Sequence, residues 1–219
     1  MEIKYYNPSN SELSKYIEGY YFLSPDNNPD NLNYYTFPNN YSILAVTYDG
    51  ITKVVQDKII VREEKNSGID CSFVGSYIKP IEVYYDKEVL ELTIYFKPFG
   101  INQFIDEDVA GKKINHYFPY DDFKSFFEYL LLLNDRNKQI GDLENYLLTK
   151  LKPRPFPLLE TILNDFDNGL SVSESAEANN ISRQYLNRLF QQHIGKSPSE
   201  YKKIQRFRKA ITEKTKKKT

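Results

Sequence analysis

The stretch NNISRQYLNRLFQQHIGKSPSEYKK, from Asn179 to Lys203, decides how the C-terminal part of this chain folds. Leu186, Leu189 and Phe190 recur in it at the spacing of one helix face, and Ser182 is suited to cap the start of that helix. A second serine-containing start signal follows in the same stretch. The pattern therefore predicts a helix over residues 182–193 and another helix after it.

A short helix and a tight turn are predicted immediately before residue 182. Ser171 and Glu174 have the spacing of a capping box, in which the hydroxyl and the carboxylate each satisfy an unpaired backbone amide. Ala176 is small enough for a close helix crossing, and Asn179 and Asn180 tolerate the positive φ that a sharp turn needs. Two short helices joined in this way form a helix-turn-helix, whose second helix can enter the major groove of DNA.

The outer face of the helix at 182–193 carries polar and basic side chains. No Asp or Glu occurs between Ser182 and Lys196. Arg can pair bidentately with guanine, and Asn or Gln with adenine, whereas an acidic side chain would repel phosphate. The sequence therefore favours DNA contact by this face over a helical hairpin that only packs or binds protein. The candidate DNA-binding residues are Arg183, Gln184, Asn187, Arg188 and Gln191.

Two further helices flank this pair. Apolar residues recur at helical spacing over 158–166, and Asn168-Gly169 is suited to end that helix in a left-handed conformation. Gly195 ends the helix at 182–193, and Ser197-Pro198-Ser199-Glu200 combines a capping box with proline at the first helical position. We expect a basic packing helix from there.

Charge and proline content divide the chain. From Leu151 onward there are 14 Lys and Arg against 7 Asp and Glu, a net of +7, whereas the first 150 residues have a net of −8. A basic module on an acidic body is typical of a protein in which one domain meets a polyanion. The sequence KPRPFP at 152–157 has three prolines and predicts a stiff linker. We expect a sensor or dimerisation domain at 1–151 and a DNA-binding domain at 158–219.

The first part of the chain is rich in tyrosine and in short segments typical of strands. Seventeen of the 19 Tyr precede Leu151, and turn residues such as Asp49-Gly50 and Asn66-Ser67-Gly68 separate the segments. The sequence predicts an α+β fold: an N-terminal antiparallel β sandwich or barrel with helices, then an all-α helix-turn-helix domain. The segment near 11–21 fits either a helix or a strand.

Two questions stay open at this level. Residues 121–133 and 141–151 have helical patterns whose apolar faces either pack on the barrel or pair with a second subunit. The tyrosines either line a small-molecule pocket or cover a half-buried sheet. His116, outside the predicted recognition helix, fits a surface or core-edge position.

At this point the sequence resembles the DNA-binding domain of the AraC family of bacterial transcription regulators. The likeness covers about 158–211 and depends on residues at mutually correct spacing: Ala176, Ile181-Ser182, Leu186, Leu189-Phe190, Gly195, Ser197-Pro198, Tyr201, Arg206-Phe207 and Ala210. FVGSYIKP at 73–80 and LTIYFKPFGINQFI at 92–105 are similar to a sensor-type N-terminal domain of one branch of that family.

The resemblance implies roles for individual residues. Gln184, Asn187 and Arg188 would face base edges, and the other two candidates would lie nearer the phosphates. Arg206 would brace the fold rather than contact DNA. The chain departs from the family at Ser175, where a large apolar residue is usual, so looser packing of the first helix is expected. The family also implies a second helix-turn-helix after Thr219, which the sequence given does not contain.

Enzyme chemistry has little support in this sequence. His116, His193 and Cys71 are the only His and Cys, so neither a multi-histidine metal site nor a disulfide can be assembled within the chain. We predict no catalytic residue, no metal and no cofactor, and a buried apolar role for Cys71. No window is long and apolar enough to span a membrane, and the start lacks a secretory pattern, so we expect a cytoplasmic protein without membrane contact.

The sequence thus leads to one hypothesis and one alternative from another class. The hypothesis is a sequence-specific transcription regulator that binds double-stranded DNA, with a small-molecule effector and a homodimer as further partners left open. The alternative is an interaction or small-molecule-sensing protein that does not bind DNA and keeps a vestigial helix-turn-helix.

Overall fold

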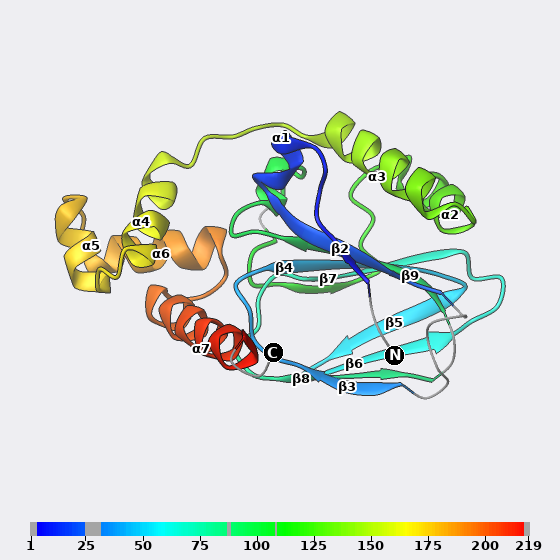
Figure 1. The fold of residues 1–219 in the computed structure, drawn as a ribbon, viewed down its shortest axis with the longest axis horizontal. Coiled ribbons are helices and arrows are strands. Elements are labelled where there is room, and N and C mark those ends of the chain that lie inside the picture. The colour runs from blue at the N-terminus through cyan, green and yellow to red at the C-terminus, as the bar shows by residue number, and fades with distance from the viewer. Residues whose placement is uncertain (1–3, 25–31, 87–88, 108, 217–219) are drawn as a thin grey trace.

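The computed structural model describes residues 4–24, 32–86, 89–107 and 109–216, and shows two β-sheets followed by helices (Figure 1). The six-stranded sheet contains, in spatial order, β1 (Tyr5–Tyr6), β2 (Ile17–Leu23), β9 (Leu90–Phe96), β4 (Ser42–Tyr48), β7 (Ile69–Val74) and β10 (Lys113–Asn115). The four-stranded sheet contains β3 (Asn33–Thr36), β8 (Ile81–Tyr85), β6 (Lys58–Glu63) and β5 (Gly50–Val55). The predicted α+β class is confirmed.

One short α-helix lies near the start of the chain, and the other α-helices follow the last strand. The segment near 11–21 that fitted either element contains both, because a four-residue helix precedes β2. The helices are α1 (Ser11–Ser14), α2 (Phe123–Leu131), α3 (Arg136–Lys150), α4 (Pro157–Asp167), α5 (Val172–Ala178), α6 (Arg183–His193) and α7 (Pro198–Lys216), with a 3-10 turn η2 at Ile101–Gln103.

Among the strands of the described residues, all pairs are antiparallel except one. β6 and β8 run parallel, with Lys58 opposite Glu82. The chain leaves the four-stranded sheet after β6, passes through β7 in the other sheet and returns as β8, and such a crossover is what makes parallel neighbours available. Predicted turn residues have the expected backbone: φ is 50° at Asp49, 63° at Asn66 and 70° at Gly68.

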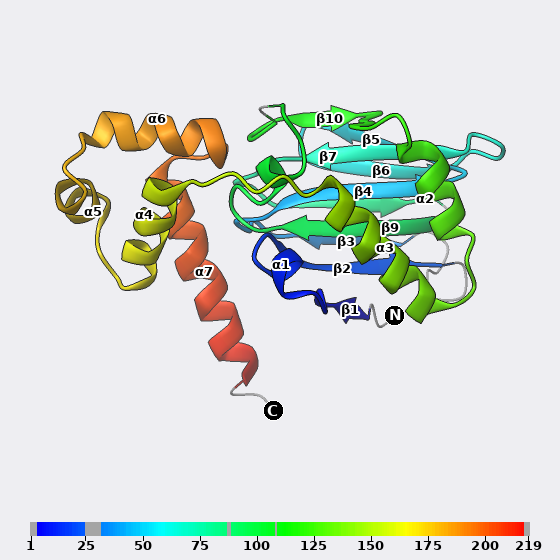
Figure 2. The same ribbon diagram turned by 90° about the horizontal axis from the view of Figure 1, so that it is seen from above.

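The β part has three layers: helices α2 and α3, the six-stranded sheet, and the four-stranded sheet (Figures 1 and 2). Phe123, Phe127 and Leu130 of α2 are buried in one core with Leu92 and Ile94 of β9. This shows that the two helices pack on the sheet, which was one of the two readings left open. Because successive side chains of a strand alternate, the residues of β9 between those positions point into the space between the sheets.

Two isolated residues have the surroundings that were predicted. Cys71 is fully buried in the core between the six-stranded sheet and the helices. The side chain of His116 is 59% exposed, and its Nδ1 lies 2.7 Å from a carboxylate oxygen of Asp70, so it stands at the edge of the core.

An extended segment connects α3 to α4. The backbone N–H of Lys152 donates to the carbonyl of Gln103, at 2.7 Å. The Phe156 ring lies 5.3 Å from the Phe99 ring and 5.0 Å from the His193 ring, measured between centroids. The predicted proline-rich linker is therefore in contact with both the β part and the helical part.

Candidate nucleic-acid interface

Local hydrogen bonds fix where α5 and α6 begin. The Ser171 hydroxyl accepts from the backbone N–H of Glu174, and the Glu174 carboxylate accepts from the Ser171 N–H, which is the predicted capping box. Ser182 caps α6 by accepting from the N–H of Tyr185 at 3.1 Å. Between the helices Asn180 has a φ of 53°, in the left-handed region that asparagine tolerates. The helix-turn-helix is therefore set by signals within a few residues of each turn.

A small apolar core supports α6 from beneath. Leu186 and Phe190 are fully buried. The Phe190 ring lies 5.6 Å from Phe166 of α4 and 5.7 Å from Tyr201 of α7, between centroids. Aromatic contacts of this kind add to the burial of apolar surface. The core fixes which side of α6 faces outward.

The packing of α5 differs from the looser arrangement expected at Ser175. This side chain is fully buried, and its hydroxyl donates to a carboxylate oxygen of Asp165 at 2.7 Å. The Asn179 side chain donates to the same oxygen at 2.8 Å. Hydrogen bonds to a charged acceptor replace the contact that a large apolar residue would make, so α5 is tied to α4 by polar contacts.

The predicted DNA-binding residues lie together on the opposite side of α6. The helical spacing places them within one face, and all five side chains are exposed: Arg183, Gln184, Asn187, Arg188 and Gln191. The guanidinium of Arg188 lies 5.1 Å from the centre of the Tyr185 ring, a cation–π contact that holds it against the helix. In Figure 2 the sheets lie beyond the C-terminal end of α6 rather than along its length. These five side chains are therefore exposed to solvent and not covered by the sheets.

The C-terminal end of α6 touches the β part through two glycines. Gly195 and Gly111 have φ values of 74° and 76°, which favour glycine. A Cβ added at Gly195 would lie 2.1 Å from the Gly111 nitrogen and 2.4 Å from its Cα. Backbone therefore meets backbone here, with no room for a side chain.

A buried lysine makes the next contact between the two parts. Lys196 is only 2% exposed, and its Nζ donates to the Asn39 carbonyl at 2.6 Å. Burial lowers the pKa of this ammonium to about 8, with a partial opposing effect from the Glu200 carboxylate. The positive charge is thus held in a place where it is poorly solvated.

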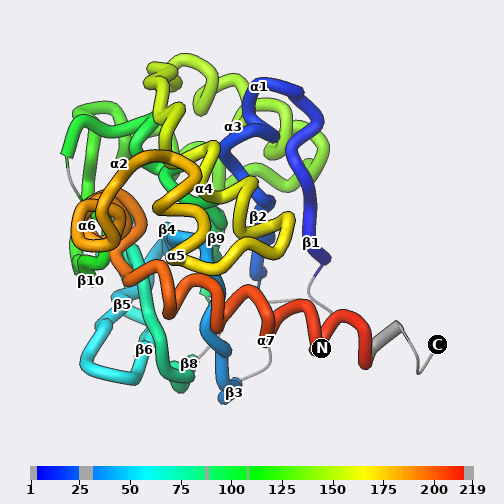
Figure 3. The backbone as a smooth tube through the Cα atoms, turned by 90° about the vertical axis from the view of Figure 1, so that its left-hand side faces the viewer, coloured from blue at the N-terminus to red at the C-terminus, as the bar shows by residue number. Residues whose placement is uncertain are grey.

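Helix α7 adds a third set of contacts, beside the segment that follows β3 (Figures 1 and 3). Arg208 donates from Nε to the Pro38 carbonyl at 2.8 Å and from a terminal nitrogen to the Phe37 carbonyl. Arg206 is exposed, so the prediction that it braces the fold is wrong. Residues two apart on a helix point in nearly opposite directions, which gives the bracing role to Arg208.

The sequence did not predict these contacts between the β part and the helical part. In the sequence, Lys196 stands out only as the end of a run without acids, and Gly195 only as a helix end. Neither has a local signal that names its partner, because Asn39 and Gly111 lie more than 80 residues away in the chain. Because α7 contains many basic residues, the sequence does not distinguish Arg208 from its basic neighbours.

The described residues offer little for other chemistry. Among them, no three His, Cys, Asp or Glu side chains come together to hold a metal ion. Of the helices within the described ranges, none combines the length and apolar character that crossing a membrane requires.

Comparison with known proteins identifies the helical part. Residues 162–201 match the model for bacterial regulatory helix-turn-helix proteins of the AraC family. This range begins within α4 and ends within α7, so it contains α5, the turn and α6. No curated protein and no solved structure matches the chain.

Proposed function

Because the chain carries an AraC-type helix-turn-helix preceded by a β-rich part, we propose that it is a cytoplasmic bacterial transcription regulator that binds specific double-stranded DNA. The observation that carries the proposal is the exposed face of α6, which has two guanidinium and three carboxamide side chains and no acid. Such a face suits the phosphates and base edges of a major groove.

Within that face the side chains have different tasks. Gln184, Asn187 and Arg188 contact base edges, where carboxamides suit adenine and a guanidinium suits guanine. Arg183 and Gln191 lie nearer the phosphates and fix the position of the helix on the duplex.

The remaining partners follow from the size of the site. One recognition helix makes few contacts, whereas specific sites usually bury more surface. A homodimer would bring two such helices to half-sites one helical turn apart. The β part would then receive the signal, in the form of a small-molecule effector.

The test is DNA binding as a function of salt. Selection from a random duplex pool gives the preferred site, and fluorescence anisotropy then measures affinity between 50 and 300 mM salt, about the range over which phosphate contacts change affinity most clearly. We expect log affinity to fall with log salt at about −0.9 per neutralised phosphate. Absent or salt-insensitive binding would favour the alternative, an interaction protein with a vestigial helix-turn-helix.

A matched pair of arginine variants tests the face itself. Arg188→Ala should lose about 1–3 kcal/mol on the selected site and relax the choice at one base pair, whereas a phosphate contact would lose affinity equally on every sequence. Arg62→Ala removes an exposed arginine from β6 and should leave binding unchanged.

A further inference from the structure

A carboxylate is buried between the two sheets. Glu91 of β9 is 2% exposed. It accepts hydrogen bonds from the Tyr85 hydroxyl at 2.9 and 3.0 Å and from the Thr93 hydroxyl at 2.6 Å. Burial raises the pKa of this group. Among the ion pairs of the described residues, none includes Glu91.

The buried carboxylate borders a small cavity with tyrosine walls. The cavity is about 50 Å³ in volume and is lined by Tyr21, Tyr34, Tyr85 and Tyr95 together with Glu91. The rings of Tyr34 and Tyr85 are stacked with centroids 6.4 Å apart, and those of Tyr21 and Tyr95 lie 6.2 Å apart. Ring faces attract cations, and a carboxylate without a cationic partner does so more strongly.

An unsatisfied hydroxyl lines the same cavity. Thr52 of β5 is 1% exposed, and its Oγ1 has no hydrogen-bond partner. A buried polar group of this kind normally has a partner, and leaving it without one costs free energy. The hydroxyl can accept an N–H from a bound molecule or donate to it, so it marks an unfilled hydrogen-bonding position on the cavity wall.

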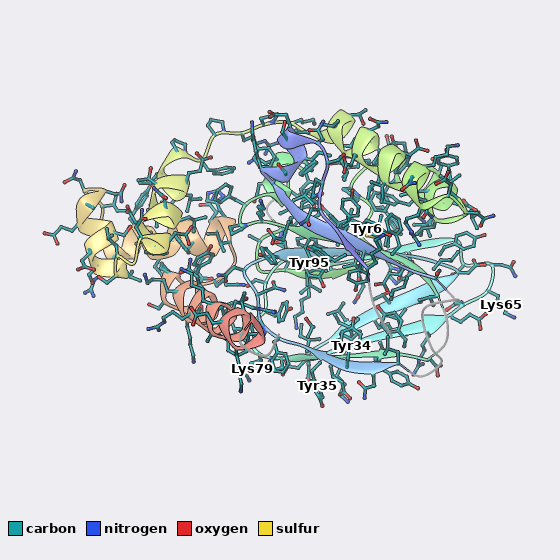
Figure 4. All side chains as sticks on the ribbon, viewed as in Figure 1. Tyr6, Tyr34, Tyr35, Lys65, Lys79 and Tyr95 are labelled. Atoms are coloured by element: carbon teal, nitrogen blue, oxygen red, sulfur yellow. The ribbon has the colours of Figure 1, made fainter. Side chains whose placement is uncertain are left out.

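A larger cleft opens next to the cavity. It has a volume of about 880 Å³ and is bounded on one side by the β part and on the other by α7. Tyr34, Thr36 and Tyr95 line both spaces, so these side chains are the shared wall between cleft and cavity. Figure 4 labels Tyr95 on β9 and Tyr34 on β3, in the two facing sheets.

Acidic residues line the cleft as well as the cavity. Glu18 of β2 lines it beside Tyr5 and Tyr41, and Asp167 and Glu213 line the opposite wall. These three acids outnumber the two bases on the same lining, Arg208 and Lys209. The guanidinium of Arg208 is engaged by backbone carbonyls. The lining therefore has one more acid than base, and Glu18 also lies 4.0 Å from the Lys97 ammonium, so the cleft does not exclude a cation on its way to Glu91.

We propose that the cleft and the cavity form one binding site for a small organic cation, whose ammonium group is held by Glu91 and Thr52 and whose body lies between the tyrosine rings. An anion would be repelled by the carboxylate, and a neutral molecule would leave it without a counter-charge. The role of this cation as the effector rests on the proposed function, whereas its binding site does not. Binding itself requires no DNA.

The site joins the two parts of the chain. A molecule extending from Glu91 into the cleft meets side chains of α7 such as Gln205 and Thr212. Its binding therefore contributes to, or competes with, the contacts that hold α7 beside the β part. An organic cation bound there would therefore act directly on α7, the helix that packs under α6.

The experiment compares three probes of one shape on the full chain by calorimetry and thermal unfolding. The probes are n-butylammonium chloride, butan-1-ol and sodium butyrate. We expect the ammonium to bind at least about tenfold more tightly than the other two and to raise Tm, since a ligand that binds only the folded state stabilises it. Equal responses to all three, or preference for the alcohol or the carboxylate, would overturn the proposal.

Variants locate the binding. Glu91→Gln should weaken ammonium binding at least about tenfold by removing the charge, and Glu128→Gln, at an exposed position of α2, should leave it unchanged. Thr52→Val keeps the side-chain shape, so it remains informative if Glu91→Gln does not fold, and should weaken binding several-fold. Unchanged binding in the folded variants would refute the assignment. If the unmodified chain binds the ammonium but does not bind DNA, only the proposed function is overturned.

Discussion

Replacing Gly195 by alanine should separate the helical part from the β part. The added Cβ would stand 2.1 Å from the Gly111 nitrogen and 2.4 Å from its Cα, so backbone must move. Lys196 is the next residue, and displacement would break its 2.6 Å bond to the Asn39 carbonyl. The change acts on the contact between the two parts and leaves the recognition face of α6 untouched.

The magnitude follows from a matched control. Gly169, at the end of α4, also has a left-handed φ, 95°, but nothing lies within 4 Å of an added Cβ. Gly169→Ala should therefore lower the free energy of unfolding only by the cost of placing alanine in a left-handed conformation, about 1–2 kcal/mol. Gly195→Ala should lower the free energy of unfolding by the same amount and by about 1–3 kcal/mol more, the usual cost of forcing an added methyl group into a packed contact. In a chain of this size each kcal/mol lowers Tm by about 2–4 °C.

Hydrogen exchange read by mass spectrometry, together with thermal unfolding, measures both effects. In Gly195→Ala we expect faster exchange at 37–41 and 109–112, where the β part meets the helices, and in Gly169→Ala no change there. If the two variants show the same exchange pattern and the same loss of Tm, the close approach of the two glycines does not hold the parts together, and the reasoning fails.

Three further predictions concern single side chains. Ser175→Ala should lower the free energy of unfolding by about 1–3 kcal/mol because it leaves the Asp165 carboxylate short of a donor, while exposed Ser173→Ala should be neutral in urea denaturation; equal losses would argue against the buried bond. Lys196, with its pKa lowered to about 8, binds its proton less tightly in the folded than in the unfolded state, so the free energy of unfolding should rise from pH 8 to about 10. Lys196→Met should flatten that rise, and an unchanged slope would show that another group causes it. Arg208→Ala should speed amide exchange at Phe37 and Asn39, which flank Pro38, and lower stability by about 1 kcal/mol, whereas Arg206→Ala should do neither; matching behaviour of the two would contradict the bracing role of Arg208.

The helix-turn-helix could be predicted from sequence because its signals are local. A capping box joins residues three apart, as at Ser171, and a helix end depends on the conformation of one residue, as at Gly169. The inner stripe of α6 likewise needs only the helical period. These features depend on residues that are close together in the chain, so the sequence alone predicts them.

Long-range arrangements could not be obtained in this way. Alternating residues look the same in parallel and antiparallel strands, so the parallel pairing of β6 with β8 left no mark. Glu91 alternates with apolar residues in β9 and looks like a solvent-facing position, yet the sheet is covered on both faces. The tyrosines do not all lie in one environment, since Tyr95 lines the cavity between the sheets and Tyr20 lies in the core under the helices; a role in binding a small molecule stays a prediction.

The meeting of Gly195 with Gly111 has a mechanical consequence for α6. The helix has 11 residues and is about 16 Å long, and it is supported by backbone contact at Gly195, just after its C-terminal end. A tilt of about 10° around that support would swing its first turn, where Arg183 lies, by about 3 Å, close to the ~3.4 Å rise between successive base pairs. In the proposed complex with DNA, a small displacement of the loop around Gly111 would therefore be magnified into a change of register along the groove.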